Sequence, residues 1–241
     1  MNLTRLELDW LKQAAKDNVQ FQKFVERAKA GEPIAKIIGH KGFWKGDFIV
    51  SKDVLDPRPD SETLIEAVLE SFPNKKVPLR ILDLGTGSGC LIISLLQEYQ
   101  NATGVAIDIS EKALKIARQN SKDLPIKFIC ADMCSLPKDI GTFDIVISNP
   151  PYIPTKDIET LDVAVKKYDP VLALDGGKDG LDFYRALSRI DFASYLFVEI
   201  GQGQEQDIID IMQKQNWTHQ KSWKDLGKIV RILSFKKQNT P

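Results

Sequence analysis

Leu79-Arg-Ile-Leu-Asp-Leu84 runs directly into Gly85-Thr-Gly-Ser-Gly89, and Cys90-Leu-Ile-Ile-Ser-Leu-Leu96 follows at once. The first segment is short and mostly apolar, which is typical of a buried strand, and the third reads as the helix after it. Three glycines in five residues permit a tight turn and let a ligand approach the backbone closely. The stretch therefore predicts a strand, a turn and a helix whose amino terminus points at a bound ligand.

Strands and helices continue to alternate after this stretch, which is typical of a parallel sheet covered by helices. The pattern predicts strands over residues 79–84, 103–108, 126–130, 143–148 and 195–200, with two more around 217–222 and 229–235. It predicts helices over residues 90–100, 110–120, 181–189 and 204–215, with a long loop between residue 148 and residue 179.

The residues before this region follow other patterns. The first 30 residues are expected to be helical, with Phe21, Phe24, Val25 and Ala28 at helical spacing. Glycines and aromatics over residues 39–50 indicate a β-hairpin. After the rigid Asp56-Pro-Arg-Pro-Asp60 crossing, Ser61 is expected to cap a helix over residues 62–72. The expected divisions are a helical segment 1–36, a hairpin linker 37–55 and an α/β domain 56–241.

Composition excludes several classes of protein. The 241 residues carry 33 Lys plus Arg and 33 Asp plus Glu, so the chain lacks the basic excess that favours non-specific nucleic-acid binding. Three cysteines and two histidines form neither a disulfide framework nor a zinc motif, so no metal is expected. The amino terminus lacks an apolar signal core, and no apolar run is long enough to span a membrane. A cytoplasmic location is expected.

Asn149-Pro-Pro-Tyr152 directly follows the strand expected over residues 143–148. Each proline fixes its own φ and pushes the preceding residue toward an extended conformation, so Asn149 and Pro150 are both held extended. Their carbonyl groups and the Asn149 amide can then meet a ligand with little freedom left. Such an acceptor-rich bracket suits a planar amino group, with Tyr152 packing on its face. A plain proline-rich turn that leaves a strand is the alternative interpretation.

Two aspartates end or follow neighbouring strands. Asp108 closes the strand after the glycine turn, 23 residues beyond Gly85, where a carboxylate can accept hydrogen bonds from both ribose hydroxyls of a nucleoside. Its alternative role is to cap the helix that starts near Glu111. Asp132 lies just past the third strand, where it could reach an adenine amino group; an ordinary loop aspartate is the alternative interpretation. No Walker-type Lys-Ser/Thr follows the turn, which argues against ATP hydrolysis, and the glycine spacing departs from the NAD fingerprint.

Taken together, these motifs resemble the class I S-adenosylmethionine-dependent methyltransferases, and within them the PrmC/HemK family of release factor glutamine methyltransferases. The resemblance covers roughly residues 30 to 235. It rests on the glycine turn, the Asn149–Tyr152 bracket and these further blocks: Val54–Asp60, Asp108–Ser110, Tyr168–Pro170, Ala173–Gly177, Asp179–Tyr184, Glu199–Gly201 and Arg231.

The resemblance implies an α/β fold with a Rossmann-like seven-stranded class I methyltransferase sheet, a small N-terminal helical appendage and a β-hairpin. It implies S-adenosylmethionine as cofactor and class 1 peptide chain release factors as partners, with no stable nucleic-acid binding and a monomeric state. The implied cofactor-binding residues are Asp83, Gly85, Thr86, Gly87, Ser88, Gly89, Asp108, Asp132, Met133 and Asn149. The implied catalytic residues are Asn149, Pro150 and Tyr152, and Pro151, Arg58 and Glu62 join them in binding substrate. A surface ion pair is the alternative interpretation of Arg58 and Glu62.

The implied reaction is transfer of a methyl group to the side-chain amide nitrogen (N5) of the glutamine in a Gly-Gly-Gln motif. We expect the Asn149 side-chain oxygen and the Pro150 carbonyl to accept the two N–H bonds of that amide, with Tyr152 on its plane. The chain departs from the family in two ways: its amino-terminal helical region looks shorter than usual, and Met133 stands where an aromatic is common. Met133 can still pack against a ring.

Two other functions fit parts of the pattern. An adenine-N6 methyltransferase acting on DNA or RNA would use the same bracket for an exocyclic amino group, although it would normally need an extra recognition domain or a basic face. A non-catalytic module that kept the fold is the second alternative, and the complete glycine turn with Asn149 and Tyr152 argues against it.

Overall fold

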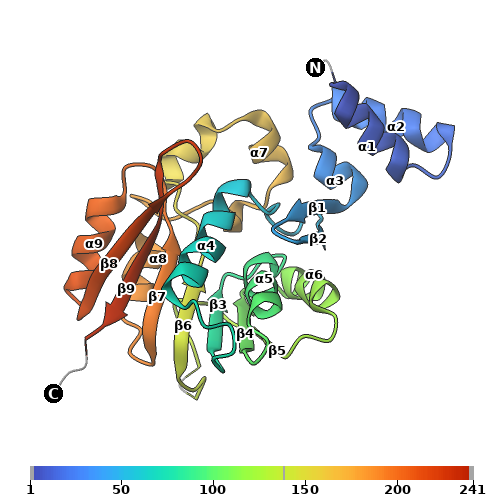
Figure 1. Ribbon diagram of the computed structural model, residues 1–241. Coiled ribbons are helices and arrows are strands. Elements are labelled where there is room, and N and C mark those ends of the chain that lie inside the picture. Colours follow the sequence, from blue (N-terminus) through green and yellow to red (C-terminus); the bar gives the residue numbers. More distant parts are fainter. Residues whose placement is uncertain (1–2, 138, 239–241) are drawn as a thin grey trace.

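The computed structural model describes residues 3–137 and 139–238, and its centre is a seven-stranded sheet with the strand order β5-β4-β3-β6-β7-β9-β8 (Figure 1). The strands are β3 Arg80–Leu84, β4 Thr103–Asp108, β5 Ile126–Cys130, β6 Phe143–Ser148, β7 Ala193–Glu199, β8 Trp217–Lys224 and β9 Val230–Lys237. Strands β3 to β7 are parallel, and β9 runs antiparallel to both β7 and β8. The sequence-based prediction of this sheet is confirmed.

Helices cover both faces of the sheet (Figure 1). They are α4 Glu62–Ser71, α5 Cys90–Glu98 and α6 Glu111–Ser121 on one face, and α8 Asp182–Ser188 and α9 Glu205–Gln213 on the other. Neighbouring residues of β3 alternate between the two sides: Ile81 packs in the core with α4 and α5, whereas Leu82 packs in the core with α8 and α9. Burial on both faces explains why the central strands carry apolar residues at neighbouring positions.

The strand order reverses beside β3. The chain moves outward from β3 to β4 and β5, then returns to place β6 on the other side of β3. In an open α/β sheet, such a switch point leaves a crevice at the carboxyl ends of the two adjoining strands. The glycine turn follows β3 and the Asn149–Tyr152 bracket follows β6, so both motifs lie at this crevice.

The amino-terminal region is helical as expected, but the helix predicted over the first 30 residues is two helices, α1 Arg5–Ala14 and α2 Asn18–Lys29. The chain breaks between them because Ala15 is extended and the Asp17 side chain caps α2 by accepting the Gln20 N–H. A short helix, α3 Ile34–Ile38, was not predicted. These helices share a small core of Leu11, Phe24, Ala28 and Ile37 and lie away from the sheet (Figure 1).

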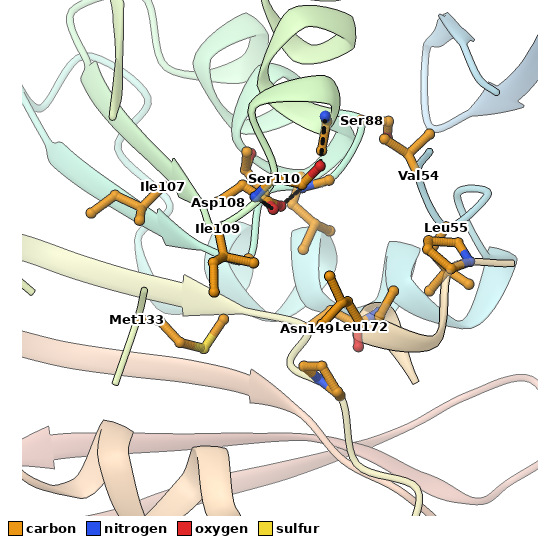
Figure 2. Close-up of a pocket in the computed structure, with 18 of the residues that line it drawn as sticks. Val54, Leu55, Ser88, Ile107, Asp108, Ile109, Ser110, Met133, Asn149 and Leu172 are labelled. Carbon is orange, nitrogen blue, oxygen red and sulfur yellow. Dashed lines mark hydrogen bonds between the residues drawn. The ribbon is translucent and has the colours of Figure 1, made fainter. Parts of the chain in front are cut away.

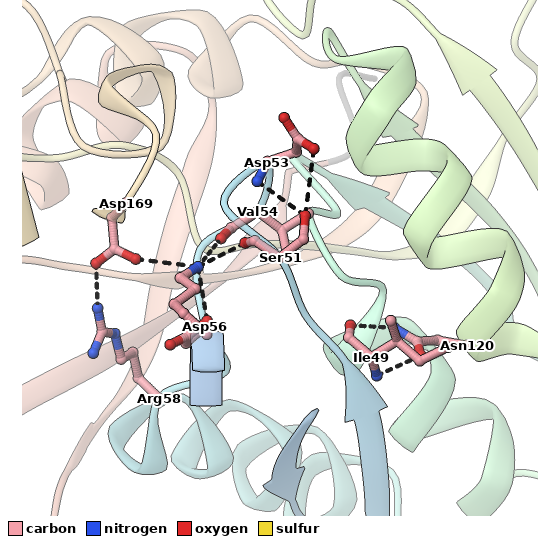
Figure 3. Close-up of polar contacts among 9 residues, drawn as sticks. Ile49, Ser51, Asp53, Val54, Asp56, Arg58, Asn120 and Asp169 are labelled. Atoms are coloured by element: carbon pink, nitrogen blue, oxygen red, sulfur yellow. Dashed lines mark hydrogen bonds and ion pairs between the residues drawn. The ribbon is translucent and has the colours of Figure 1, made fainter. Parts of the chain in front are cut away.

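The predicted hairpin is present as β1 His40–Phe43 and β2 Gly46–Ile49. Asn120 of α6 ties it to the α/β region, because its carboxamide donates to the Ile49 carbonyl and accepts the Ile49 N–H (Figure 3). The domain boundaries at residues 36 and 55 stay a prediction.

Two other expectations need correction. The Ser61 side chain does not cap α4; Ser61 ends a short 3-10 turn, η1 Pro59–Ser61, and its hydroxyl bonds to other elements instead. The loop expected up to residue 179 contains the turns η2 Thr155–Thr160 and η3 Val171–Ala173 and the helix α7 Val163–Tyr168. Across residues 3–137 and 139–238, no helix has the length and apolar character to cross a membrane.

Candidate active site

A cavity of about 300 Å³ opens at the carboxyl ends of β3 and β6. Its walls come from residues 53–58, 85–88, 107–110 and 131–134, from Ser61, Asn149 and Pro151, and from residues 170 and 172–173 of the loop before α8. Figure 2 shows Ser88, Asp108 and Ser110 together on one part of the wall and Asn149 with Leu172 on another. The structure thus brings the glycine turn, the end of β4 and the start of the bracket around one space.

The glycine turn, Gly85–Gly89, has a positive φ at each of its three glycines: 74°, 55° and 82°. Side chains with a Cβ rarely adopt these angles, so the sequence requires glycine here. A Cβ added to Gly87 would meet nothing within 4 Å, so the turn leaves open space beside its backbone. A ligand can therefore approach the main chain closely at Gly87.

Asp108 is held by the turn that it faces. Its carboxylate accepts the Gly87 N–H and the Ser110 N–H, both at 2.9 Å. Burial raises the pKa of Asp108, although these backbone bonds oppose the shift. The sequence also allowed Asp108 to cap the following helix, but the cap of α6 is Ser110, whose hydroxyl accepts the Ala113 N–H. Asp108 therefore presents a fixed carboxylate at the cavity wall, where a ribose could bind.

Asp83, near the end of β3, stabilises the glycine turn from its buried side. Its side chain is fully buried, and it accepts the Thr86 hydroxyl at 2.7 Å. Burial raises the pKa of Asp83 to about 7, against the lowering effect of that hydrogen bond. Asp83 does not line the cavity; its hydrogen bond to Thr86 instead fixes the shape of the turn.

Asp132 and Met133 lie in the wall contributed by the loop after β5. Asp132 accepts the Cys134 N–H at 2.8 Å, which fixes the loop. Met133 lies against the glycine turn, since a Cβ on Gly85 would come within 2.8 Å of the Met133 methyl group. Together with Ile109 and Ala131, Met133 gives this part of the wall an apolar surface that a flat ring could contact.

Asn149 lines the cavity, and its Nδ2 donates to the Ser61 hydroxyl at 3.1 Å. Pro151 also lines the cavity, whereas Pro150 and Tyr152 are not among the wall residues. Tyr152 is half-buried with a pKa that burial raises to about 12. The bracket therefore presents Asn149 to the cavity most directly, with Tyr152 beside it.

Close packing fixes the path of the bracket. A Cβ on Gly176 would lie 2.8 Å from the Pro151 carbonyl oxygen, and a Cβ on Gly201 would lie 3.1 Å from the Tyr152 ring. Gln204 donates to the Tyr152 carbonyl at 3.0 Å. These contacts explain two of the conspicuous blocks, Ala173–Gly177 and Glu199–Gly201: their glycines leave room for the bracket.

Arg58 lies at the cavity mouth in a cluster of charged side chains that the sequence did not predict (Figure 3). It pairs with Asp169 at 2.7 Å, and Lys36 from α3 pairs with Asp56 at 2.8 Å and Asp169 at 3.4 Å. The Lys36, Asp56 and Asp169 side chains are at most 7% exposed. This charge cluster joins the amino-terminal helices, the crossing before α4 and the loop after α7.

Glu62 does not line the cavity. Its carboxylate accepts the Trp44 N–H at 2.7 Å and so holds the hairpin against α4. Sequence reasoning also passed over Ser61 and Glu199 as site residues. Ser61 donates to Glu199, whose pKa burial raises to about 7 against the effect of the Ser61 bond. The sequence signal that could have identified them is their position: Ser61 directly follows the Asp56–Asp60 crossing, and Glu199 begins the Glu199–Gly201 block.

No group of three or more His, Cys, Asp or Glu side chains that could hold a metal occurs among the residues that the structure describes. The cavity wall instead offers a fixed carboxylate, a glycine-lined main chain, an apolar patch and an amide. These suit an organic ligand that has a hydroxylated sugar and a ring.

Comparison with known proteins agrees with this geometry. A family model described as a methyltransferase domain matches residues 81–176. The release factor glutamine methyltransferase of Rhodospirillum rubrum is 41% identical over 221 residues, covering 87% of this chain and 66% of that protein. The release factor glutamine methyltransferase of Agrobacterium fabrum is 38% identical over 232 residues, covering 92% of this chain and 80% of that protein. The chain thus spans from just under two thirds to four fifths of the length of these relatives.

Among solved structures, the magnesium protoporphyrin IX methyltransferase of Synechocystis PCC 6803 with bound SAH matches with a TM-score of 0.52 and 19% identity. The match covers 74% of this chain and 83% of that one. At this identity the likeness shows the fold alone.

Proposed function

The chain belongs to the release factor glutamine methyltransferase family, and from this premise we propose that it methylates a class 1 peptide chain release factor. The methyl group comes from S-adenosylmethionine, and its acceptor is the side-chain amide nitrogen of the glutamine in the Gly-Gly-Gln motif. The observation that carries this proposal is the shared cavity of Asn149 and the glycine turn.

The residues of the cavity fit the cofactor. Gly87 leaves open space for close approach, Asp108 offers a carboxylate to ribose hydroxyls, and Met133 lies where a ring could stack. Asp132 is within the same wall and could meet an amino group of the ring. When bound, S-adenosylmethionine supplies an electrophilic methyl group on a sulfonium.

The Asn149–Tyr152 bracket binds and orients the substrate amide. An amide nitrogen is a poor nucleophile because its lone pair is delocalised into the carbonyl. The Asn149 side-chain oxygen and the Pro150 carbonyl accept its two N–H bonds, and Tyr152 packs on its plane. Alignment of this kind can lower the barrier by several kcal/mol. The nitrogen forms its bond to the methyl carbon while the bond from that carbon to sulfur breaks. The methylated nitrogen is then positively charged and strongly acidic, so it can lose one proton to water and no strong base is needed.

Arg58 at the cavity mouth is proposed to contact the release factor, because half of its side chain stays exposed while Asp169 holds its guanidinium. Glu62 is proposed to act there through the hairpin that it holds. A monomeric state, a cytoplasmic location and the lack of stable nucleic-acid binding remain predictions of the sequence.

A labelling experiment tests the proposal. The protein is incubated with S-adenosylmethionine labelled in its methyl group, a class 1 release factor, and DNA and RNA in separate reactions. We expect label on the release factor, and none on a release factor whose Gly-Gly-Gln glutamine is replaced by alanine. Label on nucleic acid would instead support the adenine-N6 activity, and cofactor binding without transfer would support a non-catalytic module.

A further inference from the structure

Ser61 is a buried serine that connects three separate elements. It is 3% exposed, and its hydroxyl makes no capping bond to α4. It donates to the carboxylate of Glu199 at the end of β7, and its oxygen accepts Nδ2 of Asn149 at 3.1 Å. The three side chains therefore form a continuous hydrogen-bonded chain that ends in the cavity.

The direction of these hydrogen bonds follows from which groups can donate and which can only accept. An ionised carboxylate only accepts hydrogen bonds, and a hydroxyl has a single proton to donate. When the Ser61 hydroxyl donates its one hydrogen bond to Glu199, the Ser61 oxygen can only accept a hydrogen bond from Asn149. The group of Asn149 that faces Ser61 must therefore be the donor, Nδ2. The two ends of a carboxamide have nearly the same shape, so packing alone would not select this orientation.

The consequence is that Oδ1 of Asn149 is left for the cavity. Asn149 lines the cavity (Figure 2). Within residues 3–137 and 139–238, the hydrogen bond of its side chain is made by Nδ2, and none occupies Oδ1. An amide turned the other way would present a donor, which would repel the N–H bonds of a substrate amide.

We propose that Ser61 and Glu199 are positioning residues that hold the Asn149 carboxamide with its acceptor oxygen toward the substrate. This inference rests on the proposed function, because it explains how the site selects an N–H donor. Ser61 and Glu199 act only through Asn149 and do not touch the reacting atoms.

The ionisation of Glu199 sets the conditions of the test. Burial raises the pKa of Glu199 to about 7, so assays are run well above that pH, where its carboxylate only accepts. The titratable and charged groups that face it come from several elements: Asp60 of η1, Cys90 of α5, Tyr152 after β6, Tyr184 of α8 and Arg231 of β9.

A double-mutant cycle on Ser61 and Asn149 separates positioning from general stability. Single-turnover methyl transfer to a class 1 release factor is measured for wild type, Ser61→Ala, Asn149→Ala and the double variant. We expect Ser61→Ala to slow transfer about 10-fold or more while cofactor affinity changes less than about twofold. In the Asn149→Ala background, the same substitution is expected to have less than about a twofold effect, because the two residues act as one unit.

Two further variants complete the design. Ser61→Thr keeps the hydroxyl and is expected to restore most of the rate lost in Ser61→Ala. Ser94→Ala is the matched control: Ser94 is fully buried in α5, and its hydroxyl has no hydrogen-bond partner within the described residues. This control is expected to leave the transfer rate unchanged.

Full activity of Ser61→Ala would overturn the inference, as would an equal loss in the presence and absence of Asn149. Where Ser61→Ala does not fold, Glu199→Gln replaces it in the same cycle, with the same expected dependence on Asn149. A wild-type protein that labels no release factor would contradict the proposed function, whereas an active wild type with an unaffected Ser61→Ala variant contradicts only this inference.

Discussion

Ser148 donates its side-chain hydroxyl to the backbone carbonyl of Leu84 at 2.7 Å. The two residues are register partners at the ends of β6 and β3, and both are fully buried. Gly85 follows Leu84 and Asn149 follows Ser148, so this bond and the pairing of β3 with β6 together fix the distance between the glycine turn and the bracket. The proposed alignment of a methyl donor with an acceptor amide depends on that fixed distance.

Asn149→Ala is expected to reduce turnover by at least about 100-fold, because the substrate amide loses the acceptor that orients it. Cofactor affinity should stay nearly the same, since the glycine turn and Asp108 are untouched. Both quantities can be measured by single-turnover labelling and by calorimetry. Asn101→Ala is the control, because Asn101 is exposed and, among the residues that the structure describes, its side chain bonds only to the Lys76 carbonyl. Equal losses of affinity and turnover would contradict the assigned role.

Gly87→Ala and Gly31→Ala form a matched pair. Both glycines have positive φ, 55° and 91°, and a Cβ on either would meet nothing within 4 Å. Each substitution should therefore lower the free energy of unfolding by about 1 to 2 kcal/mol through backbone strain. Only Gly87→Ala places a methyl group beside the cavity, so only this variant should weaken cofactor binding, by about 10-fold (about 1.4 kcal/mol). Urea unfolding and calorimetry compare them, and equal affinities would argue against cofactor binding at the turn.

The sheet was predictable from the sequence because its strands are buried on both faces. Strands such as β3 and β6 carry apolar residues at neighbouring positions for that reason, as in Ile81-Leu82 and Ile145-Val-Ile147, and the glycine turn marks the carboxyl end of β3. The helical break at Ala15 was not predictable from spacing, since the apolar stripe continues into α2 while a local cap at Asp17 sets the boundary.

The residues missed at the site are those whose partners are remote in the chain. Ser61 precedes a helix and therefore reads as its cap, but its partners lie 88 and 138 residues away. Lys36 and Asp169 are individually ordinary charged residues that only the fold brings together. Local patterns report turns, caps and periodicity, whereas buried polar contacts between distant elements depend on the completed topology.

Lys36→Met is expected to lower the free energy of unfolding by about 3 to 5 kcal/mol, because it leaves buried Asp56 without its cation and Asp169 with Arg58 alone. Lys29→Met, at an exposed position of α2, should change it by less than about 0.5 kcal/mol. Urea denaturation measures both. Adding Asp56→Asn to Lys36→Met should recover part of the loss, because it removes the carboxylate that is left without a cation. A Lys36→Met variant as stable as wild type would show that the charge cluster contributes no stability.

Glu98 should make the stability depend on pH in the acid range. Burial alone would raise its pKa, but hydrogen bonds from Lys45, Lys75 and the Trp44 indole lower it to about 2, below the usual 4.5. A depressed folded-state pKa means that the stabilisation is complete above pH 4.5 and is lost as the pH falls toward 2.

Glu98→Gln is therefore expected to be less stable than wild type by about 1 kcal/mol at neutral pH, and the difference should shrink to nothing as the pH approaches 2. Unfolding in urea at a series of pH values measures it. Glu66→Gln on the exposed side of α4 is the control, with an expected effect below about 0.5 kcal/mol at neutral pH. A gap between wild type and Glu98→Gln that stayed constant from neutral to acid pH would mean that the glutamate acts through packing, because only its charge titrates.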